Sequence, residues 1–425
     1  MRSSFSGHVR QAGLLAVAGG AANAANVIVT VVIARLLTTR GYGALAVLVG
    51  LFFVLSMPGS ALVVAVVRRA TEWEHVGRGA EVRPWVDRFR RRLAVAVVVA
   101  AVAGAALRAP IGHLLGLPGP AGVAEVVLAG GGWLLLCIDR GLLQARRAYT
   151  PLARNLIVEG ATRTVLTVSL IGAGLGVEGA ALGLVAAMVV SEADARRSVH
   201  RLYPAVPGAD TEASHAGLLR DAVAAVSALG MLAALQSLDV VILGRDAPHE
   251  SGAYAAVSVT SKSLVYAALV LSAYLLPEAA VLRHAGQRAH RQLAVALGIV
   301  AVPAVLLFVV AVAASRPFIR LVFGAKLATA APALTPLVAA MACLAATVLF
   351  THYLLAIGSR AVVGVLAAGL ALAVALLAAA HGHPVATARA DLVAQVSLAA
   401  CAALLAWRLP VARVAGAALA PEVSP

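Results

Sequence analysis

The sequence predicts an all-α, polytopic membrane protein with about twelve transmembrane helices, arranged as two six-helix halves around a central cavity. Hydrophobic residues make up 61% of the 425 residues and charged residues only 12%, about half the charged fraction of a soluble domain. The apolar residues form runs of about 20, the length that crosses a hydrocarbon core of about 30 Å as a helix. The distribution of arginine then indicates how the chain is oriented.

Twelve apolar runs are long enough to be spans. The third is short, because its apolar part extends only from Leu93 to Leu107 and Arg108 would have to reach back to the membrane surface. An even number of spans places both termini on the same side. The predicted spans are 11–34, 44–67, 93–112, 121–138, 155–175, 177–195, 222–244, 253–277, 293–315, 331–357, 361–380 and 390–407.

Lysine and arginine are distributed unevenly between the two sides. Loops on the side of the termini hold about three times as many as the opposite loops, and only Arg163 and Lys262 lie within spans. Because cytoplasmic loops carry such an excess, we expect a multi-pass protein of the bacterial inner (plasma) membrane with both termini cytoplasmic. The net charge of +15 is then a topology signal that faces anionic membrane lipids, and it does not indicate a nucleic-acid partner.

Several function classes are disfavoured by features that the sequence lacks. Cys137, Cys343 and Cys401 lie inside apolar runs, without the spacing of a metal site or of a disulfide framework. The predicted outer loops are too short for the catalytic domain of a glycan polymerase or ligase, and no glycine-rich phosphate-binding loop indicates an ATPase. We therefore expect a protein that is not an enzyme, with no catalytic residues, no metal and no cofactor.

The chain shows a similar pattern twice. ARLLTTRGYGALAV (34–47) follows the first predicted span, and GRDAPHESGAYAAV (244–257) follows the seventh. Two six-span halves with weak internal similarity are common in secondary transporters, which bind substrate between the halves near the membrane midplane; chance similarity of alanine-rich helices is the alternative. We expect halves at residues 1–200 and 222–425, joined by a cytoplasmic linker at 201–221.

These segments also resemble a known family. ARLLTTRGYGALAV is similar to the first outer loop of the polysaccharide-exporter branch of the multidrug/oligosaccharidyl-lipid/polysaccharide flippase superfamily. Residues 235–280 resemble its seventh and eighth spans, and LLAIGSRAVV (354–363) resembles the inner turn between its tenth and eleventh spans. The resemblance implies that spans 1, 2, 7 and 8 line a central cavity. It also implies a transporter of lipid-linked oligosaccharide, with glycan polymerases and glycosyltransferases of the same pathway as partners.

The two intramembrane cations are the first candidates for substrate binding. Lys262 lies within predicted span 8, where an ionisable group is costly unless it is paired or lines a wet cavity. In the family that the chain resembles, a cation there could hold the pyrophosphate of the cargo; the alternatives are an acid pair or a side chain that reaches the surface. Arg163 lies in span 5, one turn after Glu159, so an i,i+4 pair could neutralise it.

Polar residues of span 7 could complement these cations. Gln236 and Asp239 are three residues apart and therefore share one helix face. We expect Gln236 to contact substrate. Asp239 could accept a proton, help to bind a coupling cation, offset the charge of Lys262, or serve as a polar cap near the interface.

Spans 1 and 2 hold the remaining candidates. Asn23 and Asn26 share a face of span 1, where the related peptidoglycan-precursor flippases place arginines. These amides could line the cavity or hold helices together, as amides often do in membranes. Pro58 and Gly59 lie in the middle of span 2. Proline removes a backbone hydrogen bond, so this pair is a candidate hinge, although proline is also common in membrane helices.

Two transporter functions remain in competition. The leading hypothesis is alternating-access flipping of polyprenyl-pyrophosphate-linked oligosaccharide from the inner to the outer leaflet, for cell-surface polysaccharide biosynthesis. The alternative is an ion-coupled exporter of small drug-like molecules from the same superfamily. A site for drug cations would need acidic and aromatic side chains, whereas the chain is only 4% aromatic and its mid-membrane ions are cationic. An anionic cargo is therefore favoured; a scaffold without transport activity is a further alternative.

Overall fold

The computed structural model describes residues 29–204, 216–284, 290–356 and 359–408. The described residues form helices and connecting turns, without strands. The first group of helices follows residues 29–36, which are helical and end the first predicted span. It comprises α2 (Thr39–Ser56), α3 (Pro58–His75), η1 (Gly79–Glu81), α4 (Val82–Ala106), α5 (Arg108–Leu114), α6 (Val123–Ala145), α7 (Tyr149–Leu170), η2 (Ile171–Leu175) and α8 (Gly176–Leu202).

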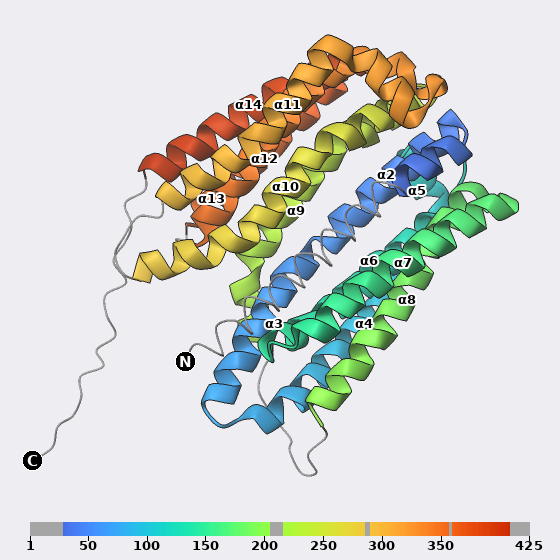
Figure 1. Ribbon diagram of the computed structural model, residues 1–425. Helices are drawn as coiled ribbons and strands as arrows, with labels where there is room; N and C mark the ends of the chain where they lie inside the picture. Colours follow the sequence, from blue (N-terminus) through green and yellow to red (C-terminus); the bar gives the residue numbers. More distant parts are fainter. Residues whose placement is uncertain (1–28, 205–215, 285–289, 357–358, 409–425) are drawn as a thin grey trace, which may run out of the picture.

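The second group forms a separate bundle beside the first (Figure 1). Within it, α10 packs against α12, and α12 packs against α14. This division into two halves confirms the predicted fold class, whereas the exact boundaries of the halves and of the linker stay predictions. The second group comprises α9 (Ala216–Asp246), α10 (Ser251–His284), α11 (His290–Phe323), η3 (Ala325–Ala333), α12 (Leu334–Ala356), α13 (Ala361–Ala378) and α14 (Pro384–Arg408).

The predicted number of twelve spans is not confirmed. Among the described residues, eight helical stretches are long and apolar enough to cross a membrane, or nine if α4 and α5, bent by 72°, form one broken span. One stretch of 54 residues contains both α7 and α8, which pack along each other. Gly174 and Gly176, with φ of +91° and +52°, make the reversal between them, because glycine adopts positive φ without steric cost.

The lipid-facing surface is clearest on α11. Its valines and leucines at 302, 305, 306, 309 and 312 are exposed, and an apolar surface of this kind is stable only in hydrocarbon. The exposed apolar side chains and the long apolar helices identify a multi-pass membrane protein. α11 contains Pro303 and Pro317, and its backbone leaves helical geometry at Ala314, which accounts for a kink in this helix.

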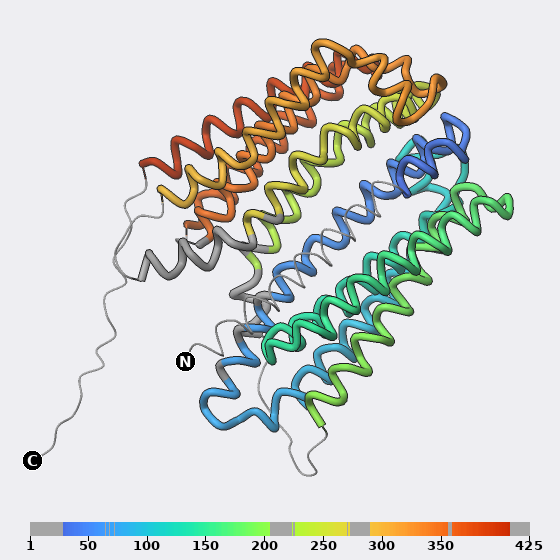
Figure 2. Tube along the Cα trace, viewed as in Figure 1, coloured from blue at the N-terminus to red at the C-terminus, as the bar shows by residue number. Residues whose placement is uncertain are grey.

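The two halves meet mainly where α2 packs against α9 and α10, as the chain trace in Figure 2 also shows. A side-chain carbon at Gly252 would overlap the carbonyl oxygen of Thr39, and one at Gly43 would lie 2.7 Å from the backbone nitrogen of Gly252. Only glycine permits this backbone approach. We call the meeting of α2 with the α9–α10 turn the glycine seam; it lies at the end that the arginine distribution predicts to be the outer one.

Candidate functional site

A buried ionic cluster in the first half is built on one face of α7. Asn155, Glu159 and Arg163 follow each other at intervals of four residues, and Arg140 approaches them from α6. Arg140 donates to the Glu159 carboxylate at 2.9 Å and to the Asn155 side-chain oxygen at 2.8 Å. The Arg163 guanidinium lies 3.4 Å from the same carboxylate. The i,i+4 pair of Glu159 and Arg163 therefore exists, and Arg140 turns it into a three-membered group.

This first-half cluster carries more positive than negative charge. Two guanidiniums, those of Arg140 and Arg163, share the single carboxylate of Glu159. The Arg163 side chain keeps 23% of its surface exposed, compared with 7% for Arg140. Arg163 also acts electrostatically on Tyr266 of α10, whose ring lies 5.9 Å from that of Phe53 in α2. The more exposed cation of this cluster thus lies near the second half.

A second cluster lies in the second half around Asp239. The Lys262 ammonium donates to one Asp239 oxygen at 3.3 Å, and the Ser258 hydroxyl donates to the other at 3.1 Å. Asp239 is fully buried and the whole Lys262 residue is 8% exposed. Asp239 therefore offsets Lys262 across neighbouring helices, one of the arrangements that the sequence left open. The phosphate-binding role of Lys262 stays a prediction, and a phosphate would have to compete with Asp239.

Asp391 of α14 completes the second-half cluster. It is fully buried, and its charge interacts with those of Asp239 and Lys262. Gln395, one turn later, donates to one Asp391 oxygen at 3.1 Å. The other oxygen has no hydrogen-bond partner among the described residues. The cluster thus contains two carboxyl groups and one ammonium group, the opposite balance to that of the first half.

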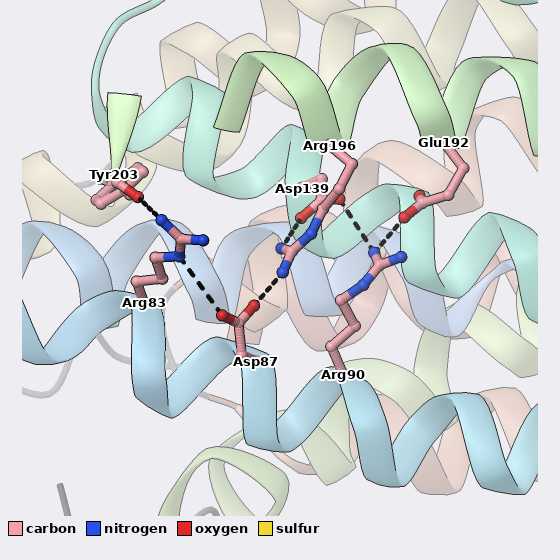
Figure 3. A network of polar contacts seen from close by, with 7 residues as sticks. All are labelled: Arg83, Asp87, Arg90, Asp139, Glu192, Arg196 and Tyr203. Atoms are coloured by element: carbon pink, nitrogen blue, oxygen red, sulfur yellow. Dashed lines mark hydrogen bonds and ion pairs between the residues drawn. The ribbon is translucent and has the colours of Figure 1, made fainter. Parts of the chain in front are cut away.

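A larger ionic network ties α4, α6 and α8 together in the first half (Figure 3). Asp139, which is fully buried, lies 3.0 Å from Arg90 and 3.3 Å from Arg196. Arg90 also pairs with Glu192, and Arg196 with Asp87. Arg83 extends the network to Asp87 at 3.6 Å and to the Tyr203 carbonyl oxygen at 2.9 Å. Three arginines balance three acids here, so we interpret this network as structural.

The remaining predicted site residues are placed as follows. Gln236 is buried on α9, and its amide nitrogen has no hydrogen-bond partner among the described residues. Pro58 begins α3, which is separated from α2 only by Met57, a residue with helical backbone angles, and both helices belong to one apolar stretch from Thr39 to His75; the function of Pro58 as a hinge stays a prediction. A side-chain carbon at Gly59 would crowd Trp133 at 2.9 Å. The remaining two candidates, Asn23 and Asn26, lie outside the described residues.

Sequence reasoning missed Arg140 and Asp391. Arg140 was assigned to an inner loop, although it follows the apolar run that ends at Ile138 and is buried in the structure. Asp391 lies within the predicted twelfth span, so the rule that singled out Lys262 could have found it. The partners of Arg140 lie on α7, at positions that sequence spacing does not reveal, whereas Gln395, which hydrogen-bonds to Asp391, lies one turn later on the same helix.

Comparisons with known proteins found solved structures with a similar fold. No family model matches the sequence, and no curated protein matches it. An inward-facing multidrug resistance MATE family transporter of the MOP superfamily matches with a TM-score of 0.71 at 11% identity, over 90% of this chain and 94% of that one. The lipid II flippase MurJ, in an inward closed conformation, matches with a TM-score of 0.68 at 12% identity, over 94% and 88%.

A third similar structure, the MATE transporter ClbM in complex with Rb⁺, matches with a TM-score of 0.59 at 18% identity, over 95% of this chain and 93% of that one. Identities this low establish the fold alone. The sequence resemblance led us to expect the superfamily that groups drug exporters with lipid-linked sugar flippases. These structures with a similar fold are transporters of that superfamily. The chain has the fold of MATE and MurJ transporters of the MOP superfamily.

Proposed function

We propose that the chain is a flippase for a lipid-linked anionic oligosaccharide, specifically one carried on polyprenyl pyrophosphate. It would move this cargo from the inner to the outer leaflet for cell-surface polysaccharide biosynthesis, by alternating exposure of a site between its two halves. The sugars and phosphates of such a cargo cannot cross hydrocarbon unaided, whereas its lipid tail can stay in the bilayer. The protein therefore has to shield only the charged head group.

The observation that supports this proposal is the charge of the first-half cluster. Two arginines share one glutamate, and guanidinium groups bind phosphate oxygens through paired, charge-assisted hydrogen bonds. Arg163 is the more exposed of the two and lies near Tyr266 in the other half. A pyrophosphate between the halves would bind Arg163 and add negative charge beside the two guanidiniums.

Other predicted residues would have secondary functions in this proposal. Asn23, Asn26 and Gln236 would bind the sugars through their amides. Lys262 would contact a phosphate only when its bond to Asp239 breaks. The polymerase and glycosyltransferases of the same pathway would be partners of the protein. The ion-coupled drug exporter stays the second candidate, because the two buried carboxyl groups of the second-half cluster are the kind of group that binds cations or protons.

The test is made in the host organism. We would delete the gene, extract lipids, and measure whether polyprenyl-linked oligosaccharide accumulates while the surface glycan disappears. Complementation would compare wild type with Arg163→Ala, Arg163→Lys and Arg154→Ala at matched protein levels. Arg154 is the control, because it lies on the same helix but pairs with Asp194 at 2.7 Å and keeps 52% of its side chain exposed.

The flippase proposal expects the intermediate to accumulate in the deletion strain and to be cleared by wild type and by Arg154→Ala. Arg163→Ala should clear it at least tenfold more slowly, which corresponds to losing about 1.4 kcal/mol of binding, and Arg163→Lys should be intermediate. If no intermediate accumulates and sensitivity to cationic drugs rises, the exporter is the correct function. If Arg163→Ala clears the intermediate as fast as wild type, the cargo does not bind at Arg163.

A further inference from the structure

The second-half cluster is built like a cation site. Tyr254, Ser258 and Lys262 follow one face of α10 at intervals of four residues. This face meets Asp239 of α9, which Ser258 and Lys262 contact directly and with which Tyr254 interacts electrostatically. Asp391 and Gln395 approach from α14. Three helices of one half thus bring carboxyl, hydroxyl and amide oxygens together in a buried place.

Two buried carboxyl groups near each other need a positive charge, hydrogen bonds or a proton to compensate them. Transferring an ionised carboxylate from water into a protein interior is costly unless a counter-charge or hydrogen bonds compensate it. Asp239 and Asp391 are both fully buried, and one oxygen of Asp391 has no partner among the described residues. A monovalent metal ion bound by these oxygens would be one solution, and a structurally similar transporter, ClbM, was determined in complex with Rb⁺.

Lys262 supplies the positive charge in this chain. Its ammonium lies 3.3 Å from Asp239 and interacts electrostatically with Asp391, so the positive charge that a metal ion would bring to these acids is already present. An ammonium group offers three donors and no acceptor, and therefore cannot act as a ligand to a metal. Two cations within a few ångströms in a low-dielectric interior would repel each other by several kcal/mol. The residues present do not fit a metal ion while Lys262 stays charged.

We infer that Lys262 is a built-in cation that takes the place of a monovalent metal ion beside Asp239, so that this chain binds no Na⁺ or Rb⁺ between Asp239 and Asp391. The geometry that supports the inference is the direct contact of Lys262 with one buried Asp239 oxygen, while Ser258 donates to the other. The inference applies to this protein whether its cargo is a lipid-linked sugar or a drug. The inference can be tested directly, because removing the Lys262 side chain should create an ion site that the wild-type protein lacks.

The experiment measures ion binding directly, on purified full-length protein in detergent. Equilibrium binding of radioactive Rb⁺ would be measured for wild type, Lys262→Met and the double variant Lys262→Met/Asp239→Asn. Thermal unfolding would be recorded in RbCl, NaCl and choline chloride at equal ionic strength. Lys326→Met is the matched control: it removes the only other lysine of the chain, which lies in η3 outside the cluster.

The inference expects that neither wild type nor Lys326→Met binds Rb⁺. For each of these two proteins, the unfolding temperature should be the same in RbCl, NaCl and choline chloride. Lys262→Met should bind about one Rb⁺ per chain and gain a few degrees of stability in RbCl or NaCl over choline chloride, because a ligand that binds only the folded state stabilises it. The double variant should lose both effects. Lys262→Gln, which keeps a polar group beside Asp239, should behave like Lys262→Met and replaces it if the methionine variant does not fold.

Two results would overturn the inference. One is Rb⁺ or Na⁺ binding by wild type that Asp239→Asn abolishes, since the metal position would then be free despite Lys262. The other is a folded Lys262→Met or Lys262→Gln protein that gains no ion binding, since Lys262 would then not be filling a cation position. Neither readout depends on transport, so the result is separate from the test of the proposed flippase function.

Discussion

Arg35 and Lys326 exchange hydrogen bonds between the two halves at the predicted outer end. Arg35, at the end of the first span, donates to the carbonyl oxygens of Leu321 at 2.9 Å and Val322 at 3.2 Å in the last turn of α11. Lys326, in η3, donates in return to the carbonyl oxygens of Arg35 at 3.3 Å and of Leu37. Each cation satisfies carbonyl groups that a helix end leaves without partners and also complements the helix dipole.

We expect the double variant Arg35→Ala/Lys326→Ala to open the outer end more often, because it removes all four of these hydrogen bonds. Hydrogen–deuterium exchange measured by mass spectrometry should increase in the peptides that cover the glycine seam. Hydrogen–deuterium exchange should not change in the peptides that carry the larger ionic network of α4, α6 and α8. Arg316→Ala is the control, because Arg316 is exposed at the same end of α11. Equal exchange at the seam in wild type and the double variant would show that these bonds do not hold the halves together.

We expect Gly252→Ala to prevent tight closure of the glycine seam, because the added methyl group would overlap the Thr39 carbonyl oxygen. The protein should still fold, since the collision lies between the halves and separation relieves it. Transport should fall at least tenfold, because alternating access requires the outer end to close. Gly364→Ala, at a position where a methyl group meets no atom within 4 Å, should transport normally. Normal transport by Gly252→Ala would show that closure does not need this contact.

The sequence predicted contacts within one helix better than contacts between helices. The Glu159–Arg163 pair follows from helical spacing alone, and it is present in the structure. Pairing with Lys262 was only one of several functions expected for Asp239, because sequence spacing cannot show which faces of two helices meet. Arg140 was missed for the same reason, because its partners lie on α7, whereas Asp391 lies inside a predicted span and could have been found there. The number of spans could not be fixed either, because a run of apolar residues does not reveal bends such as that between α4 and α5.

We expect Asp139→Asn to destabilise the first half strongly. Asp139 is fully buried and binds both Arg90 and Arg196, so the neutral amide would leave two guanidiniums without their shared counter-charge. Removing one member of a buried ion pair costs about 3 kcal/mol. Glu81→Gln is the control, because its pair with Arg78 is at the surface, where ion pairs contribute little to stability. Thermal unfolding in detergent should separate the two variants clearly; similar midpoints would contradict a structural function of the network.

We expect Glu159→Gln to make the first-half cluster more responsive to a pyrophosphate. The substitution leaves the guanidiniums of Arg140 and Arg163 without their common carboxylate, so the protein should become less stable when no anion is present. Farnesyl pyrophosphate, a short soluble relative of the proposed lipid carrier, should restore stability in proportion to its binding. Its effect on the unfolding temperature should be larger for Glu159→Gln than for wild type, and absent for Arg163→Ala.

Farnesol separates the contribution of the phosphates from that of the lipid tail, because it has the same tail and no charge. If farnesol stabilised Glu159→Gln as much as farnesyl pyrophosphate did, the ligand would be binding through its tail and the cluster would not be an anion site. If inorganic pyrophosphate alone reproduced the effect, the cluster would recognise the phosphates without the lipid. The result expected for a flippase is a response to farnesyl pyrophosphate that exceeds both, since the two parts of the cargo bind together when the phosphates meet Arg163 and the tail stays in the apolar surroundings.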